Sequence, residues 1–168
     1  AKLDRTPEIA EKLAEVYATP GFRDGRNRER AGELLAEIGR ARLQTRDDAT
    51  GINYLRRAVG IDPSSKGASE ALQEALQAQA QWGELDRALR HRSAIVTDPD
   101  ERASLLRRRA ALYRSQMPNR AALIEVLGEL LAYEPPIGKA SRELRALLHE
   151  DQDWEALSRL MEAEINSL

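Results

Sequence analysis

The chain lacks cysteine altogether and is poor in aromatic residues, with two Trp, four Tyr and one Phe among 168 residues. The absence of cysteine excludes disulfide frameworks, thiolate zinc sites and cysteine nucleophiles. It leaves the compartment open, because a chain without thiols is stable in any redox environment. The scarcity of aromatics weighs against proteins that bind nucleic acid by stacking bases on side chains.

The chain also lacks a long apolar run and an excess of one charge. Its longest mostly apolar stretch, Ala121 to Ala132, contains two glutamates and is far short of the ~20 residues of a membrane span. Basic and acidic residues number 26 and 28, a balance that disfavours a dedicated nucleic-acid or membrane-surface protein. No basic-then-apolar leader is visible, although a start at Ala1 in place of Met leaves room for a removed upstream segment. We expect a cytoplasmic protein with no membrane partner.

What the chain does have is an internal repeat. Pro63, Pro99 and Pro135 lie 36 residues apart, and each follows an acidic residue. Trp82 and Trp154 lie 72 residues apart. The 72-residue offset is the stronger one, because it aligns many identical residues, among them Glu29/Glu101, Arg30/Arg102, Ala31/Ala103, Leu34/Leu106, Ile52/Ile124, Leu55/Leu127, Leu76/Leu148 and Leu85/Leu157. The pattern predicts two alternating units and a duplication of the larger block.

Each unit has the pattern of two helices. Apolar residues recur at steps of three and four, as in Ala103, Leu106 and Ala110, and no segment alternates with the period of a strand. Asp98 followed by Pro99 is typical of a helix start. The sequence therefore predicts an all-α fold, an α-solenoid of antiparallel helix pairs with about four units of 36 residues in a 72-residue super-repeat.

The expected domain organisation follows from these boundaries. An N-terminal helix and loop occupy residues 1–27, and the repeat array occupies residues 28–168. The array divides into units 28–63, 64–99, 100–135 and 136–168, which makes nine helices in all.

The ends of two units resemble a known repeat family. The segments from Ala58 to Pro63 and from Ala94 to Pro99 match the Ala-x-x-x-Asp-Pro ending of the second helix in the tetratricopeptide repeat. The family's small-residue positions look like Ala75 or Ala110. Residues 28–168 are covered by the resemblance, which implies a right-handed solenoid whose concave face binds a partner protein or peptide.

The chain departs from that family in two respects. Its period of 36 exceeds the family's roughly 34 residues, and Trp82 and Trp154 open the second helix of their units instead of the first. The Sel1-like repeat is the alternative relative.

Arginines supply the candidate binding surface. Residues 84–120 hold nine arginines against five acids, whereas residues 121–168 hold four basic and ten acidic residues. Arg107 and Arg114 fall on one flank of the apolar stripe and Arg108 nearly opposite it. We expect these three to bind an acidic protein or peptide, because guanidinium groups bind carboxylates bidentately. The alternative is a solvated face with intramolecular ion pairs. Arg102 and Arg109 fall beside the stripe, where we expect them to pair with acids or to extend their charged ends to solvent.

Two other functions stay open beside the protein-binding scaffold. One is a helical repeat that binds nucleic acid through the Arg87–Arg120 region. The other is self-association, in which the basic middle of one copy meets the acidic end of another.

The C-terminal helix carries an apolar stripe that nothing after it covers. We expect the array to continue beyond Leu168 or this face to pack on a second copy. Trp82 and Trp154, at the head of such stripes, are predicted to pack between helices. The stripe consists of Trp154, Leu157, Leu160, Met161, Ile165 and Leu168.

No set of residues predicts catalysis, a cofactor or a metal site, so we do not expect an enzyme. The spacing of a calcium loop is matched by Asp151, Asp153, Glu155 and Glu162, but Ala156 stands where such a loop needs glycine. An acidic helix start is the better interpretation.

Overall fold

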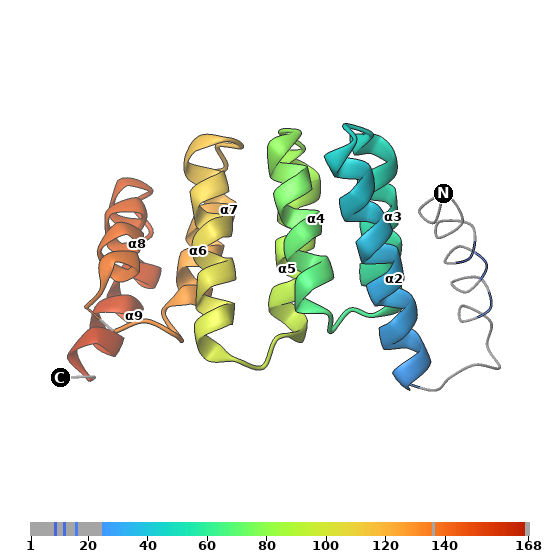
Figure 1. Ribbon diagram of the computed structural model, residues 1–168. Coiled ribbons are helices and arrows are strands. Elements are labelled where there is room, and N and C mark those ends of the chain that lie inside the picture. The colour runs from blue at the N-terminus through green and yellow to red at the C-terminus, as the bar shows by residue number, and fades with distance from the viewer. Residues whose placement is uncertain (1–8, 10–11, 13–15, 17–24, 136, 167–168) are drawn as a thin grey trace. The chain divides into compact units, whose positions relative to one another are not determined.

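The computed structural model describes residues 9, 12, 16, 25–135 and 137–166. Within that part of the chain every regular element is a helix (Figure 1), which confirms the predicted all-α fold of successive helix pairs. The N-terminal helix and loop expected in residues 1–27 lie almost entirely outside the described residues. From residue 25 onward the described helices are α2 (Gly25–Gln44), α3 (Asp48–Ile61), α4 (Lys66–Ala78), α5 (Trp82–Ile95), α6 (Pro99–Ser115), α7 (Arg120–Leu130), α8 (Lys139–Glu150) and α9 (Trp154–Ile165).

The helix starts repeat most regularly at an offset of 72 residues, which is two of the 36-residue repeat units. α3 and α7 begin 72 residues apart, as do α5 and α9. The starts of α3, α5, α7 and α9 are separated in turn by 34, 38 and 34 residues, so the helices alternate around the 36-residue spacing of the prolines.

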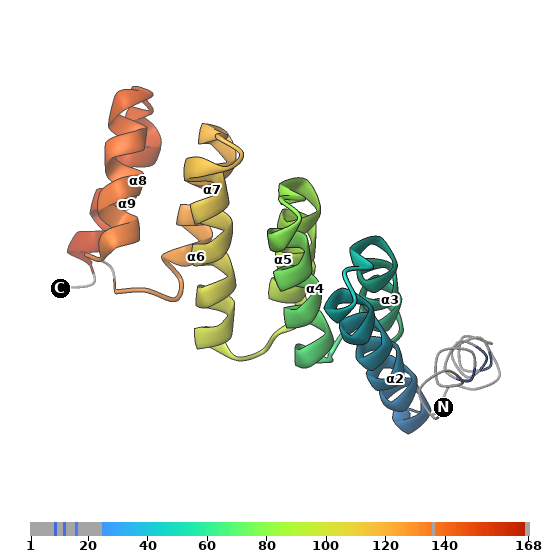
Figure 2. The ribbon, with the colours of Figure 1, turned by 45° about the horizontal axis from the view of Figure 1, so that its top comes forward.

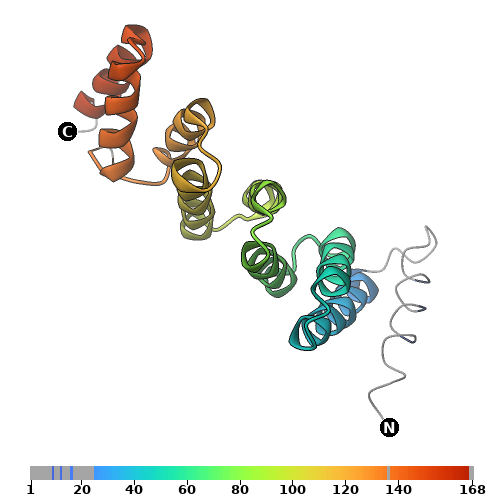
Figure 3. The same ribbon diagram turned by 90° about the horizontal axis from the view of Figure 1, so that it is seen from above.

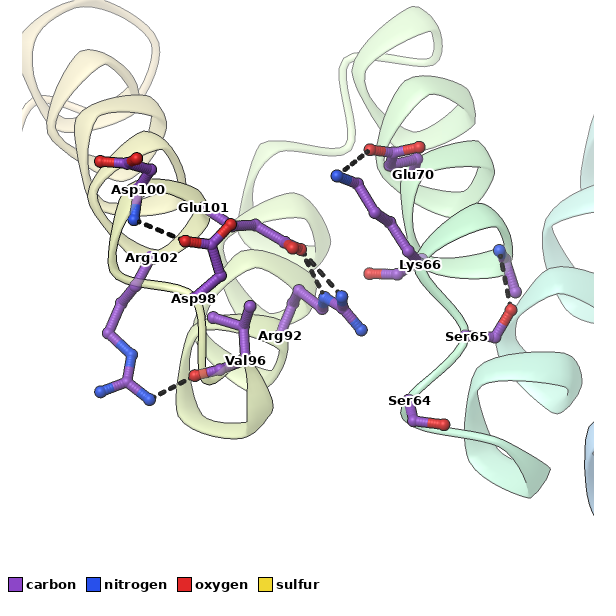
Figure 4. A network of polar contacts seen from close by, with 12 residues as sticks. Ser64, Ser65, Lys66, Glu70, Arg92, Val96, Asp98, Asp100, Glu101 and Arg102 are labelled. Atoms are coloured by element: carbon purple, nitrogen blue, oxygen red, sulfur yellow. Dashed lines mark hydrogen bonds and ion pairs between the residues drawn. The ribbon is translucent and has the colours of Figure 1, made fainter. Parts of the chain in front are cut away.

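Side-chain caps explain where several helices begin. Asp98 accepts a hydrogen bond from the Asp100 amide with Pro99 at the first helical position, as predicted, and Ser65 accepts one from the amide of Ala68 (Figure 4). Asn119 and Asp153 cap α7 and α9 in the same way. Each of these oxygens satisfies an amide that the first helical turn leaves without a partner.

The chain divides into two compact units, Ala1–Ala88 and Leu89–Leu168, with the boundary inside α5. In unit 1, α2 lies against α3, and both helices contact α4. In unit 2, α6 lies against α7, α7 against α8, and α8 against α9 (Figures 2 and 3). The expected division into four units of the array stays a prediction.

Unit 2 has a continuous apolar core drawn from all four of its complete helices. Ala103 and Leu106 of α6 meet Leu127 of α7, Leu144 of α8 and Leu160 of α9 in this cluster, and all are at most 8% exposed. No helix in the described part of the chain combines the length and apolarity needed to cross a bilayer.

Candidate partner-binding groove

Unit 2 contains a groove of about 490 Å³. It is lined by the C-terminal part of α5, by α6 and by α7 with the residues that follow it. Its walls combine arginines, glutamates and one tyrosine with small and apolar side chains. The lining residues are Arg90, Ser93, Ala94, Arg102, Leu106, Arg109, Glu125, Glu129, Ala132 and Tyr133.

Arg102 is held in this groove by two neutral acceptors. Its guanidinium donates to the hydroxyl of Tyr133, at 3.0 Å. It also donates to the carbonyl of Val96, as Figure 4 shows. The same group lies 5.8 Å from the centre of the Tyr133 ring, where the face of the ring attracts a cation. Its Nε is buried and has no hydrogen-bond partner. The guanidinium is therefore fixed in place while its positive charge meets no carboxylate in these contacts.

Arg109 is almost fully buried, with 2% of its surface exposed. Its guanidinium lies 3.9 Å from the carboxylate of Glu129, whose side chain is 48% exposed. The predicted pairing of Arg109 with an acid is thereby confirmed, whereas Arg102 uses neutral acceptors.

The predicted binding residues Arg107, Arg108 and Arg114 do not line the groove. The Nε of Arg107 donates to Glu134 at 2.6 Å, and Arg114 forms two 2.6 Å hydrogen bonds with Glu143. The hydrogen bonds with Glu143 raise the pKa of Arg114 above its ordinary value, against a smaller opposing effect of burial. Arg108 is half-buried. A partner at these arginines would have to compete with two carboxylates of the chain itself, so their role in binding stays a prediction.

Arg120, at the end of the predicted basic region, joins α7 to the end of α8. It lies 2.9 Å from Glu150 and 2.6 Å from Asp151, and these hydrogen bonds, that with Glu150 first, raise its pKa. The residues 72 positions earlier form the equivalent contact between α3 and the end of α4. There Asp48 of α3 is the acceptor and Gln79 is the donor, at 2.6 Å, so donor and acceptor are exchanged relative to Arg120 and Asp151. The duplicated block therefore keeps a contact while it changes the charges that form it.

A second groove, of about 480 Å³, lies between α8 and α9. Leu157 and Met161 of α9 line it together with Arg142, Arg145 and His149 of α8. Trp154 lies beside this groove with its ring against His149, the two centroids 5.4 Å apart, and remains 56% exposed. The prediction that Trp154 packs between helices is therefore wrong, because no described element covers the outer side of α9. Trp82 is half-buried.

The described residues hold no group of three or more His, Cys, Asp or Glu side chains placed to bind a metal ion. Asp153, which suits a calcium loop by its spacing, instead caps α9 through the amide of Ala156.

The sequence places Arg102 and Arg109 beside the apolar stripe but does not indicate that they form a binding pair. Their position between two apolar sets was a usable signal of burial. Tyr133, which holds Arg102 from 31 residues away, carried no local signal.

No protein-family model matches the chain, and no curated protein matches it in sequence. Among solved structures it is similar to the crystal structure of MamA protein, with 17% identity, a TM-score of 0.49 and coverage of 98% of this chain and 93% of that one. It is also similar to MamA residues 41 to the end from Desulfovibrio magneticus RS-1, with 14% identity, a TM-score of 0.46 and coverage of 99% and 96%. At these TM-scores the likeness decides neither fold nor function.

Proposed function

We propose that the chain is a non-enzymatic interaction scaffold of the tetratricopeptide-like kind, located in the cytoplasm. The groove of unit 2 binds an acidic segment of a partner protein or peptide. The observation that carries this proposal is the pair of arginines, Arg102 and Arg109, held in the groove by neighbours that leave the charge of Arg102 without a carboxylate.

An acidic ligand suits the groove for two reasons. Three arginines and two glutamates line it, so its formal charge is positive before any ligand enters. Arg109 is buried and Arg102 is half-buried, whereas Arg90 is exposed, and guanidinium groups shielded from water interact with carboxylates more strongly than exposed ones do. Ala94 and Ala132, both exposed, add an apolar surface for the ligand's neighbouring side chains.

Binding of nucleic acid through Arg87–Arg120 is the weaker candidate. Arg107, Arg114 and Arg120 of that region each pair with a carboxylate at 2.6 Å. Phosphate binding would have to break these pairs, and the net charge of −2 adds no general attraction for a polyanion.

Fluorescence anisotropy with three labelled probes tests the proposal. The probes are an octapeptide of alternating Glu and Gly, its Lys counterpart, and a single-stranded oligothymidine of matched length. We expect the acidic peptide alone to bind, and Arg102→Gln or Arg90→Gln to weaken its binding at least about tenfold, since charged hydrogen bonds contribute about 1.5–3 kcal/mol. Circular dichroism of each variant checks that the helices remain.

Arg107→Gln and Arg114→Gln are the matched controls, because they remove the same charge outside the groove. Both should bind the acidic peptide as the unaltered protein does. If only these controls lose binding, the site lies on the predicted surface of Arg107, Arg108 and Arg114. Preference for the oligonucleotide would support the nucleic-acid alternative instead.

A further inference from the structure

The outer face of α9 is an apolar surface that the described residues leave open. Trp154, Met161 and Ile165 are 56%, 45% and 66% exposed, and Leu157 is half-buried. Leu160, on the inner side, is 8% exposed and belongs to the core. Residues spaced by three or four lie on one side of a helix, so the three exposed side chains and Leu157 form one stripe. Leu168 of the predicted stripe lies outside the described residues.

The same face is closed in α5, the helix that precedes α9 by one block. Leu85 and Leu89 occupy the positions of Leu157 and Met161, and they are 2% and 0% exposed. Two positions of the stripe are therefore buried in α5, whereas the position of Ile165 holds Ser93 there.

Within unit 2, the C-terminal end of α5 is joined to the first turn of α6. Arg92 of α5 forms a buried ion pair with Glu101 in the first turn of α6, at 2.8 Å, and Arg102 of α6 donates to the carbonyl of Val96 (Figure 4). Charges here agree with the helix dipoles, because α5 ends on a cation and α6 begins with Asp100 and Glu101.

At the end of α9 the charges are reversed. Glu162 and Glu164 stand at the positions of Arg90 and Arg92, and no basic residue lies in the last turn. Glu164 turns inward, where it accepts hydrogen bonds from Ser141 and from Arg145 of α8. A helix that begins with acids, as α6 does, would be repelled by this end, whereas a helix that begins with cations would be attracted.

Among the described helices that begin with a cation, α2 is the repeat equivalent of α6. α2 has no acid in its first turn and begins with Arg26 and Arg28, which stand where α6 has Asp98 and Asp100. Both arginines are exposed, and neither has an ion pair or hydrogen bond in the described structure. Cations at this end of a helix oppose its dipole. Leu34 of α2, half-buried, stands at the position of Leu106.

We propose that the chain associates head to tail, with α2 of a second copy docked on the outer face of α9. In this contact α9 takes the place of α5, and α2 of the second copy takes the place of α6. The acidic and basic sides of the contact are exchanged. Arg26 and Arg28 of one copy face Glu162 of the other, and the apolar stripe of α9 takes Leu34 and the aliphatic parts of the α2 arginines. Glu29 causes no repulsion from Glu164, since that carboxylate is 8% exposed and already bound to Arg145.

Pairing of α9 with α9 of another copy fits less well. A twofold axis between two antiparallel α9 helices places each side of α9 beside the same side of α9 in the other copy. Glu155 and Glu162 would then face the same acids, and Arg142 of α8 would face its own equivalent. Head-to-tail contact avoids both conflicts and gives open chains in place of a closed dimer.

Sedimentation velocity of the full chain, from about 10 μM to about 1 mM, tests this joint. We expect the mean mass to rise with concentration beyond a dimer, and to rise less at about 0.5 M salt than at about 0.05 M. Glu162→Arg or Arg28→Glu should weaken association at least about tenfold, and Ile165→Glu should abolish it. The chain with both Glu162→Arg and Arg28→Glu should recover association, because the two charges are exchanged.

Lys66→Glu is the matched control, since it reverses an exposed cation at the first position of α4. It should leave the masses unchanged. A chain that stays monomeric throughout overturns the proposal, as does failure of the doubly exchanged variant to recover. Association that survives Ile165→Glu would also exclude this face. None of these results bears on the groove of unit 2, whose peptide binding is measured separately.

Discussion

Two residues with positive φ stand at equivalent positions of the duplicated block. Ala80 has φ 52° and Gln152 has φ 57°, and each follows the end of a helix. The next amides, of Gln81 and Asp153, donate back to the carbonyls of Leu76 and Leu148 at 2.9 and 3.0 Å. These hydrogen bonds hold the left-handed conformation, which costs a residue with a Cβ about 1–2 kcal/mol.

Glycine at either position should therefore stabilise the protein. We expect Ala80→Gly and Gln152→Gly each to raise the free energy of unfolding by about 0.5–1 kcal/mol, since the relief of strain exceeds the added entropy of the unfolded chain. Urea denaturation measures the change. Gln77→Gly is the control, because Gln77 is an exposed residue inside α4 and should lose stability there. A loss at Ala80 would show that the turn tolerates its alanine without strain.

At the scale of elements, the contact between α2 and α3 depends on two glycines that face each other. A Cβ on Gly39 would lie 2.8 Å from the Cγ of Leu55 and 3.0 Å from the carbonyl oxygen of Gly51. A Cβ on Gly51 would lie 2.8 Å from the Cγ of Leu43 and 2.9 Å from the carbonyl oxygen of Gly39. Backbone oxygens on both sides leave no side chain that can simply rotate away, so the two helices would have to separate.

Alanine at either glycine should destabilise unit 1. We expect Gly39→Ala and Gly51→Ala each to lower the free energy of unfolding by about 1–3 kcal/mol, the usual cost of overpacking. Gly128→Ala in α7 makes the same chemical change where nothing lies within 4 Å, and there it should gain up to about 1 kcal/mol of helix propensity. Thermal denaturation followed by circular dichroism distinguishes the cases. Equal effects at all three positions would contradict the close approach of α2 and α3.

At the scale of the whole molecule, each unit carries a buried core of its own. Leu55 of α3 is fully buried in unit 1, and Leu127 of α7 is fully buried in unit 2. In repeat proteins each unit contacts chiefly its neighbours, so stability is close to a sum over units and their joints. Local damage in such a chain remains largely local.

Hydrogen exchange should show this independence. We expect Leu127→Ala, which removes about 2–5 kcal/mol of core packing, to speed amide exchange in α6, α7 and α8 far more than in α2 and α3. Leu55→Ala should give the converse pattern. Uniform loss of protection in both units would mean that the chain unfolds as one cooperative body.

The helices and their repeat could be predicted from the sequence because their causes are local. Apolar steps of three and four residues indicate a helix within a few turns, and the Asp98-Pro99 start depends on atoms of adjacent residues. The 72-residue block needs only comparison of the chain with itself, and the starts of α3 and α7 confirm it.

The candidate sites could be predicted only in part. Arg107 and Arg114 are on the helix that the sequence indicated, but Glu134 and Glu143 reach them from 27 and 29 residues away. Helical periodicity gives the face of a residue on its own helix and carries no information about which residues another element brings to it.

By itself, then, the sequence determined an all-α chain of paired helices, their capped starts and the duplicated block. Only the tertiary structure decided that Arg102 and Arg109 share a groove with Tyr133, that Arg107 and Arg114 are paired, and that Trp154 lies exposed. The physical reason is that burial and ion pairing depend on distances between helices far apart in the chain, and these distances are determined by packing and not by the order of residues along one helix.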